Sequence, residues 1–410
     1  MQIKKTLLAA AVTALVAATA QAQTLAPSGG TGLTVGNDKS AVTLYGLIDV
    51  TMSNVNAQNA SNGSKLSFQT PWFSGNRFGV QGKHDTGGGL NALFKLEAEF
   101  VANTGEQDTP GNLFNRDAWI GLQSADLGKL SFGRQNNIAR DPAASAVYGD
   151  AYGPAKASTE EGGYTNTNNF KQMIYYAAGP ASGDAGTANA GKADTRYNRG
   201  IVWKKEFGSV LAGFGWQTPA YAGGAADGFA KNTSKTGTLA YNGADYTIAG
   251  FYTSANVANL AASTASIGGN YQVNSLVRVN AGLFSYNAKQ VALLGGDRKD
   301  TAWTISAKFT PAGKMDYQVG YQVMKATNAA LSGAAGAVGS TVTNAYADAS
   351  AKTATGTGAR KTLYGSAFYH LDSTTELYVA ADRVNMDAGY GNINGQASQM
   401  EYGVGMRLKF

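Results

Sequence analysis

The chain has 410 residues, enough for one large β architecture or two ordinary domains. Charged residues make up 15% of it, well below the quarter typical of soluble domains, yet its mean hydropathy is slightly negative at -0.21. Cysteine is absent, which excludes a disulfide framework, and a net charge of +6 is too small to indicate a nucleic-acid partner.

The first 22 residues predict a cleaved export signal. Lys4 and Lys5 precede a short apolar run, Thr6–Ala18, and Ala20-Gln21-Ala22 provides a small-residue cleavage site. The run is shorter than the roughly 20 residues of a helical span, which favours cleavage over a transmembrane anchor. Removal leaves 31 of the 33 basic residues against 27 acidic ones, a net charge of +4.

Residues 23–40 are rich in Gly, Ser and Thr, and we expect a flexible segment there. From Val42 onward apolar and polar residues alternate with period two, the period of a β-strand. At the C-terminus every even residue from Met400 to Phe410 is apolar, and every odd residue from Gln399 to Lys409 is polar or glycine. Other alternating stretches are Val42–Val50, Gly75–Lys83, Leu90–Phe100, Val210–Trp216, Trp303–Phe309 and Tyr317–Val323.

The connections between these stretches have two lengths. Asp85–Gly89 and Leu371–Thr375 are short, whereas Gln135–Asn169, Ala178–Tyr197 and Thr327–Arg360 are long and poor in apolar residues. One end of the sheet is therefore predicted to carry short turns, and the other end is predicted to carry long loops. No stretch predicts a helix of amphipathic length.

Two architectures fit this pattern. A soluble β-sandwich would carry many Lys and Glu residues on its outer faces, but here Gly, Ser, Thr and Tyr dominate the polar faces. A transmembrane antiparallel barrel turns apolar side chains to lipid and polar ones to a lumen, and it must close because lipid cannot satisfy backbone amides. With strands of about 9–11 residues, the length fits about 16 strands around an aqueous channel.

The sequence predicts no catalytic, cofactor-binding or metal site, and hence no enzyme. Gly186–Lys192 matches the first part of a phosphate-binding loop, but Ala193 follows where that motif needs Ser or Thr. His84 and His370 are the only histidines, and most of the chain separates them.

Several blocks resemble Gram-negative general porins, especially the β-proteobacterial type. The resemblance covers residues 41–410 and is most specific at its two ends. The blocks that carry it are Val42–Asp49 (VTLYGLID), Gly75–Val80 (GNRFGV), Arg116–Leu122 (RDAWIGL), Leu127–Gln135 (LGKLSFGRQ) and Tyr402–Phe410 (YGVGMRLKF).

The resemblance implies an outer-membrane homotrimer of 16-stranded barrels that passes ions and small hydrophilic solutes by passive diffusion. It implies contacts with the lipid bilayer and lipopolysaccharide, and with an assembly machinery that reads Phe410. It also implies that a third external loop, residues 135–169, folds into the lumen and faces wall arginines. A substrate-specific channel on the same fold, or a barrel enzyme or adhesin, are the alternatives.

The resemblance places Arg77 and Arg134 on that wall. Alternation points Arg77 inward on the same face as Gln81 and Lys83, and Lys83 is a further candidate. Arg134 stands at an even position, as do Leu130 and Phe132, which are expected to face outward. A bulge at Gly133 is therefore needed to turn Arg134 inward.

Arg116 is another wall candidate with the same parity problem and no such glycine. A third arginine expected after the loop is missing, because Asn169 stands at its position with Lys171 nearby. Gln81 stands where close relatives often have a basic residue, so strong anion preference is not expected.

The loop offers four acidic candidates for the constriction: Asp141, Asp150, Glu160 and Glu161. A connection this long without regular structure is usually functional or disordered. Each acid is either part of the pore lining or merely solvated, and the sequence leaves both open.

Overall fold

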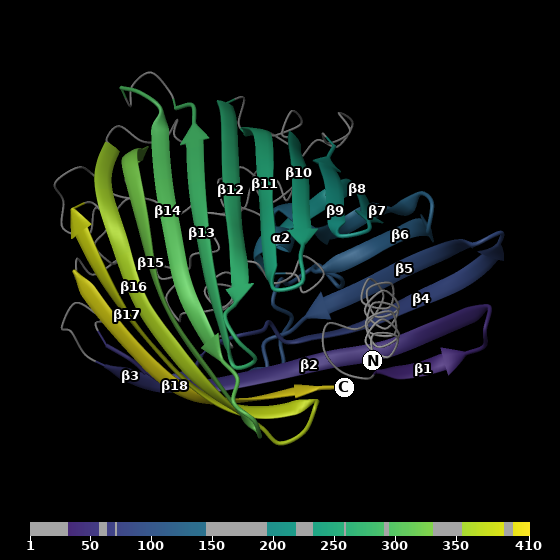
Figure 1. Cartoon of the computed structure of the whole chain (residues 1–410), viewed down its shortest axis with the longest axis horizontal. Coiled ribbons are helices and arrows are strands. Elements are labelled where there is room, and N and C mark those ends of the chain that lie inside the picture. Colours follow the sequence, from purple (N-terminus) through teal and green to yellow (C-terminus); the bar gives the residue numbers. More distant parts are fainter. Residues whose placement is uncertain are drawn as a thin grey trace, which may run out of the picture.

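A computed structural model describes residues 32–56, 64–69, 72–144, 195–218, 233–257, 260–290, 295–330, 355–388 and 397–410. Among these residues eighteen strands form one antiparallel sheet, which closes where the last strand pairs with an early one (Figure 1). None of the helices in the described ranges is long and apolar enough to cross a membrane.

Sixteen of the strands form a closed barrel, as expected. They are β2 (Ser40–Val55), β4 (Arg77–Gly87), β5 (Leu90–Glu99), β6 (Asp117–Ser124), β7 (Gly128–Asn136), β8 (Arg196–Phe207), β9 (Val210–Gln217), β10 (Thr233–Asn242), β11 (Tyr246–Val257), β12 (Leu260–Gln272), β13 (Val277–Ala288), β14 (Arg298–Phe309), β15 (Met315–Ala330), β16 (Thr355–His370), β17 (Thr375–Ala388) and β18 (Ser398–Lys409).

The other two strands both pair with β2. The short strand β3 (Lys65–Gln69) lies beside Thr51–Val55, while β4 lies beside Ser40–Leu47. The strand β1 (Leu33–Gly36) pairs with Ala41–Leu44. Part of the segment that we expected to be flexible therefore belongs to the sheet, whereas residues 1–31, which include the expected export signal, lie outside the described residues.

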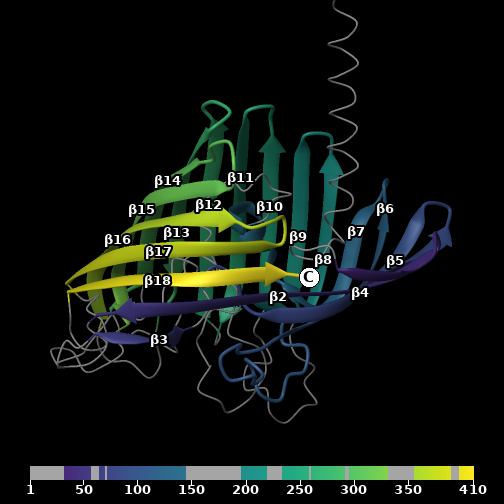
Figure 2. The same ribbon diagram turned by 90° about the horizontal axis from the view of Figure 1, so that it is seen from below.

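The barrel closes along β18 and β2, which lie side by side in Figure 2. Lys409 is paired with Leu47 and Glu401 with Val55, a register overlapping the predicted partner Val42–Val50. Beyond the last pair, the amide of Gly46 donates to the carbonyl of Phe410 at 2.8 Å and the amide of Phe410 donates back at 3.0 Å. The final residue is thus part of the hydrogen-bonded seam.

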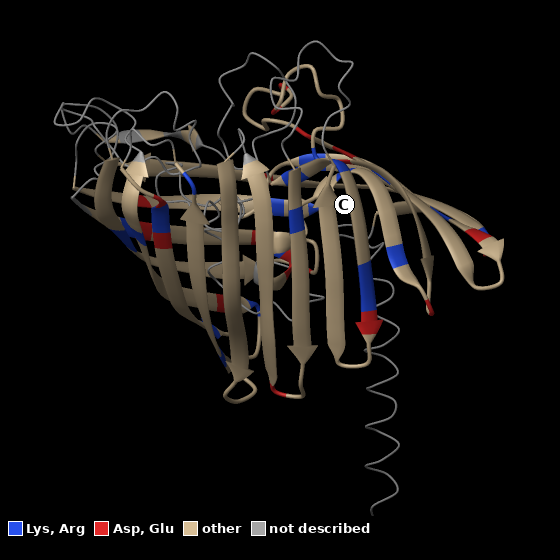
Figure 3. Cartoon of the chain, turned by 90° about the horizontal axis from the view of Figure 1, so that it is seen from above, with Lys and Arg blue, Asp and Glu red and all other residues tan. Residues whose placement is uncertain are grey.

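The two faces of the wall are inverted relative to a soluble protein. On β18, Tyr402 and Val404 are 56% and 51% exposed, while Gln399 and Glu401 on the inner face are 2% and 0% exposed. On the other strands large apolar side chains also face outward, whereas the inner face carries polar residues together with some buried apolar ones such as Phe251 and Phe284. Figure 3 shows long stretches of strand without a charged residue. This is the arrangement of a transmembrane barrel and excludes the soluble sandwich.

Short and long connections alternate around most of the barrel, as the sequence predicted, but only residues 258–259 join β11 to β12, so three short connections follow one another between β10 and β13. Residues 137–195 join β7 to β8. The expected loops 135–169 and 178–197 therefore belong to one connection, the third of the long connections in chain order. The loop expected over Thr327–Arg360 is shorter than predicted, because β15 continues to Ala330 and β16 begins at Thr355.

Interior tyrosines occupy the space left by glycines on neighbouring strands. A Cβ on Gly79 would fall 2.7 Å from the hydroxyl oxygen of Tyr45, and a Cβ on Gly405 would fall 2.2 Å from the ring of Tyr378. Any side chain at these glycines would displace a buried ring. Tyrosine and glycine therefore act as matched pairs across the strands.

An irregular segment, Trp72–Asn76, enters the interior between β3 and β4. The rings of Phe73 and Tyr378 meet edge to face with centroids 4.8 Å apart. Trp72, Phe368 and Ala380 complete this buried apolar cluster. The side chain of Asn76 accepts a hydrogen bond from the amide of Asp49 at 2.6 Å, which compensates for the interrupted pairing of β2.

Candidate functional site

The inner faces of β4 to β8 carry a dense group of charged side chains. We call it the wall cluster, and its described members are Arg77, Lys95, Glu97, Glu99, Arg116, Asp117, Arg134 and Arg196. Five of these described side chains are cations and three are anions, so carboxylates on the same wall offset much of its positive charge.

Glu97 lies at the centre of the wall cluster and is 1% exposed. Its carboxylate accepts hydrogen bonds from Nε of Arg116 at 2.6 Å and from the hydroxyl of Tyr45 at 2.7 Å. Lys95 Nζ lies 3.2 Å away. A buried carboxylate is tolerated when it is paired and hydrogen-bonded, and these three partners provide that.

Lys95 also connects two carboxylates that would otherwise repel each other. Glu97 on β5 and Asp117 on β6 are directly opposite each other in the sheet. The ammonium of Lys95 lies 2.9 Å from Asp117 and 3.2 Å from Glu97. The like-charged cross-strand pair is therefore bridged by one cation.

Arg77 faces inward, as alternation predicted. It is 6% exposed, whereas the neighbouring Phe78 is 45% exposed. Its Nε donates to the carbonyl of Gly75 at 2.8 Å, and on β5 it is opposite Glu99.

The predicted bulge at Gly133 is present. The register of β7 against β8 shifts between Gly133 and Gln135, and Gly133 has a φ of 127°. Arg134 is re-aimed by this irregularity: its Nε donates to the carbonyl of Asn115 at 2.6 Å, and its guanidinium also contacts the side chain of Asn198.

Arg116 joins the wall cluster for a different reason. It precedes β6, which begins at Asp117, so strand alternation does not fix its direction. Its guanidinium bonds both Glu97 and Glu99. The parity problem seen in the sequence therefore disappears.

An arginine that the sequence analysis did not consider, Arg196, stands at the start of β8, directly after the long connection. Its Nε donates to the carbonyl of Arg116 at 3.0 Å. Arg196 thus lies close to Arg116, at the point where the connection 137–195 returns to the wall. Asn169 and Lys171 lie outside the described residues, so the expectation about them stays a prediction.

Lys83 is separated from these arginines. It lies six residues beyond Arg77 on β4, about 20 Å along the strand, and its side chain is exposed. The structure therefore brings together three of the four predicted basic residues and leaves Lys83 apart.

The start of the long connection lies against the inner wall. The turns η1 (Ile138–Arg140) and α2 (Asp141–Ala144) contact β10 and β11, and Ile138 is fully buried. The side chain of Asn137 caps η1 by accepting from the amide of Ala139 at 3.0 Å.

Asp141 is the one predicted acid within the described residues, since Asp150, Glu160 and Glu161 fall outside them. It forms an ion pair with Lys204 on β8. Lys204 lies directly opposite Lys129 on β7, so Asp141 offsets the repulsion between two adjacent lysines.

Sequence reasoning did not assign Lys95, Glu97, Glu99, Asp117 and Arg196 to the site. The polar face of β5 is visible in the alternation Lys95, Glu97, Glu99. Its pairing with Arg116 depends on strand register, which alternation alone does not give.

The chain matches the Gram-negative porin family over residues 9–406. Over 194 residues it is 35% identical to an outer membrane porin protein of Bordetella pertussis, covering 44% of this chain and 46% of that relative. The matched region therefore spans about half the length of this curated relative.

Solved structures share the fold. The anion-selective porin from Comamonas acidovorans superposes with a TM-score of 0.63 at 21% identity, covering 91% of this chain and 100% of that one. The trimer form of OmpT, an outer membrane protein of Vibrio cholerae, gives 0.58 at 14% identity, with 91% and 100% covered. With the family match over nearly the whole length, the chain belongs to the Gram-negative porin family and is a multi-pass outer-membrane β-barrel.

Proposed function

We propose that the protein forms a water-filled channel for passive diffusion of ions and small hydrophilic solutes. The observation that carries this proposal is the wall cluster, whose charged side chains face the interior of a barrel with an apolar exterior. A barrel of 16–18 strands is too wide for side chains to fill and leaves an aqueous passage. Transport by this route makes and breaks no covalent bond.

The connection 137–195 is the proposed constriction loop. Its first residues already lie against the inner wall. Arg77, Arg116 and Arg134 form the proposed basic side, and Asp141 contributes to the acidic side together with Asp150, Glu160 and Glu161. Opposite charges across a narrow opening in low-dielectric walls create a field that favours polar solutes. Because Glu97, Glu99 and Asp117 share the basic wall, we expect weaker anion preference than from arginines alone.

The assembly is proposed to be a homotrimer in contact with lipopolysaccharide. The trimer form of Vibrio cholerae OmpT supports this, since it shares the fold. Residues 1–22 are the proposed export signal, and Phe410 the proposed signal for the outer-membrane assembly machinery. Deleting Phe410 should reduce insertion far more than it changes ion selectivity in the molecules that insert; equal loss of both would contradict this role.

Planar-bilayer recording tests the channel. Conductance steps in threes, with currents that rise linearly and do not saturate with solute, are expected. Saturation by one solute class would instead indicate a substrate-specific channel, and absence of any conductance would overturn both.

The reversal potential in a salt gradient tests whether the wall cluster determines the preference of the channel for anions or cations. Arg116→Gln should shift it toward cation preference, whereas Lys83→Gln, a neutralisation away from the wall cluster, should shift it much less. Equal shifts would show that the wall cluster does not line the narrowest part of the path.

A further inference from the structure

We propose that His370 is a specificity-determining residue of the channel and makes its preference between anions and cations depend on pH. His370 is the last residue of β16, at the end of the barrel that carries the short turns. Its chain neighbours Tyr369 and Leu371 are exposed on the outer surface, so the imidazole faces the lumen. His370 acts in this way only if the protein is the channel proposed above, because its charge must then act on passing ions.

Five ionisable side chains form a row across the inner face of the wall at this end. We call it the mouth row, and its members are Lys308 on β14, Asp316 on β15, His370 on β16, Glu376 on β17 and Arg407 on β18. Glu376 lies directly opposite both His370 and Arg407 in the sheet. The mouth row therefore connects the last five strands of the barrel.

Neighbouring members of the mouth row are paired. Nζ of Lys308 and Nε2 of His370 each lie 3.1 Å from the carboxylate of Asp316. Nδ1 of His370 lies 3.3 Å from the carboxylate of Glu376, which also pairs with Arg407. Cations and carboxylates thus alternate, and His370 occupies a cation position between two carboxylates.

The protonation state of His370 decides the net charge of the mouth row. Histidine is the side chain whose charge ordinarily changes between about pH 5 and about pH 8. A neutral imidazole has one N–H to donate, whereas the imidazolium has two, one for each flanking carboxylate. The other two cations of the row cancel its two carboxylates, so protonation of His370 gives the row one net positive charge.

The other ionisable groups near His370 have partners of their own. In the adjoining turns, Lys314 donates to a backbone carbonyl at 3.1 Å, and Asp372 accepts from a backbone amide at 2.7 Å. On the far side of Arg407, Asp49 is fully buried and accepts a hydrogen bond from a tyrosine hydroxyl. The carboxylates that face the imidazole within 4 Å are therefore the two of the mouth row.

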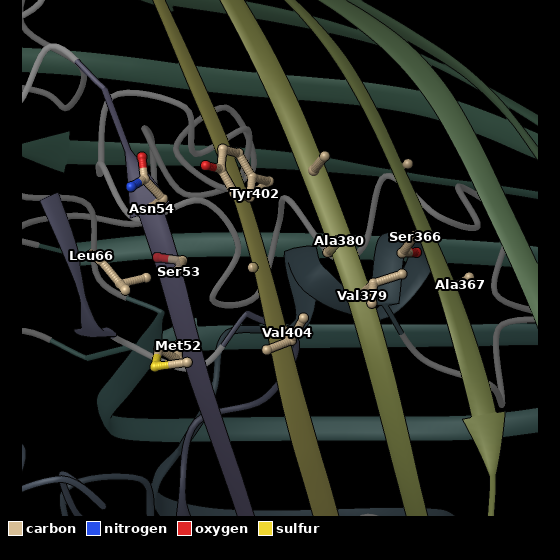
Figure 4. Close-up of a pocket in the computed structure, with 13 residues that line it drawn as sticks. Met52, Ser53, Asn54, Leu66, Ser366, Ala367, Val379, Ala380, Tyr402 and Val404 are labelled. Carbon is tan, nitrogen blue, oxygen red and sulfur yellow. The ribbon is translucent and has the colours of Figure 1, made fainter. Parts of the chain in front are cut away.

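Ions at the mouth can approach His370. Its side chain is 36% exposed, whereas that of Glu376 is 7% exposed. The outer side of the same wall is apolar, and Tyr402 and Val404 line a groove of about 540 Å³ on the outer surface of β2 and β16 to β18 (Figure 4). A low-dielectric wall directs the field of a lumenal charge into the aqueous passage. A proton on His370 therefore favours anions at this mouth and disfavours cations.

The reversal potential of a potassium chloride gradient, measured between about pH 8 and about pH 5.5, tests this role. In the wild type the permeability ratio of chloride to potassium should rise about twofold as the pH falls, the effect of one unit charge about 8 Å away in salt solution. His370→Gln should abolish the rise. His370→Arg carries its charge at every pH of the series, so it should show the higher ratio throughout.

His84→Gln is the matched control. His84 is the other histidine of the chain, and its Nδ1 lies 2.7 Å from the hydroxyl of Ser40 near the same end of the barrel. Asp49→Asn is a second control, which removes the ionisable carboxylate opposite Arg407. Both variants should keep the pH dependence of the wild type. A rise that persists in His370→Gln, or that disappears in either control, would overturn the role of His370.

A second measurement needs no change at position 370, and it decides if the variants at this position fail to fold. In His84→Gln, His370 is the one histidine left, so imidazole NMR signals in detergent micelles report its protonation alone. The midpoint of this titration should coincide with that of the permeability ratio, and two separate midpoints would overturn the proposal. Wild-type conductance with a ratio independent of pH would refute the role of His370 and leave the channel intact. Absence of any conductance would overturn both.

Discussion

The aromatic ring of Phe410 lies directly over Gly46, and the two residues exchange backbone hydrogen bonds of 2.8 and 3.0 Å. A Cβ on Gly46 would fall 2.2 Å from the ring. The last residue of the chain and the first strand of the barrel therefore fit each other in both backbone and side chain.

Substitution of Gly46 by alanine should destabilise this seam by about 1–3 kcal/mol, the usual cost of overpacking. The measurement is the urea dependence of unfolding in detergent micelles. Gly237→Ala is the control, because no atom lies within 4 Å of the position that its Cβ would occupy. If both variants unfold at the same urea concentration, the ring contact contributes nothing.

Tyr45→Phe should lower the free energy of unfolding by about 1.5–3 kcal/mol, because the buried carboxylate of Glu97 loses a hydrogen-bond donor at 2.7 Å. Tyr252→Phe is the comparison, since this outward tyrosine is 56% exposed. Its unfolding should match the wild type. Equal stability of all three proteins would show that Arg116 and Lys95 satisfy Glu97 without the tyrosine.

Gly133→Ala should be more harmful than Gly46→Ala. Its Cβ would meet the carbonyl oxygen of Ala118 at 2.3 Å, and backbone cannot move aside as a terminal ring can. The φ of 127° adds about 1–3 kcal/mol of strain. Since the bulge aims Arg134, we also expect the reversal potential to move in the direction of Arg134→Gln. A destabilised variant with unchanged selectivity would place Arg134 away from the ion path.

Asp372 gives the turn between β16 and β17 a pH dependence. Hydrogen bonds from the backbone and hydroxyl of Thr374 and the amide of Thr375 hold the pKa of the Asp372 carboxyl below its usual range. A depressed pKa means that the stabilisation is present at neutral pH and is lost as pH falls through the folded-state value.

Hydrogen exchange at the amides of Thr374 and Thr375 reports on this turn. Their protection should decrease below about pH 4 in the wild-type protein. Asp372→Asn keeps an acceptor oxygen but does not titrate, so its protection should not change over that range. If amide protection has the same pH dependence in the wild type and in Asp372→Asn, the stability of the turn does not depend on the ionisation of Asp372.

The faces of the strands could be predicted because period two is a local property of the sequence. Tyr402 and Glu401 point where alternation places them, and Gly133 identified the bulge that re-aims Arg134. Alternation alone does not predict which apolar residues lie inside. Phe251, Phe284 and Phe368 are buried on regular strands, and Trp72 and Phe73 are buried where the chain leaves the strand.

The charge pairing of the site could not be predicted in the same way. Which carboxylate pairs with Arg116 depends on the register between β5 and β6. The position of Arg196 in the wall depends on the length of the irregular connection before β8. Neither the register between two strands nor the length of a loop can be recognised from the periodicity of the sequence. The composition of the wall cluster is therefore a property of the assembled barrel.

The strand β1 has a consequence for association with other chains. β18 ends at Lys409, opposite Leu47, so the first residues of β2 would expose unpaired amides and carbonyls on that side. Such an edge is a template on which foreign strands add and aggregates grow. β1 covers Ala41–Leu44 and satisfies their backbone groups on that side, so the exposed edge passes to the four residues of β1 itself. We expect a chain without β1 to add foreign strands at Ala41–Leu44 more readily than the intact chain.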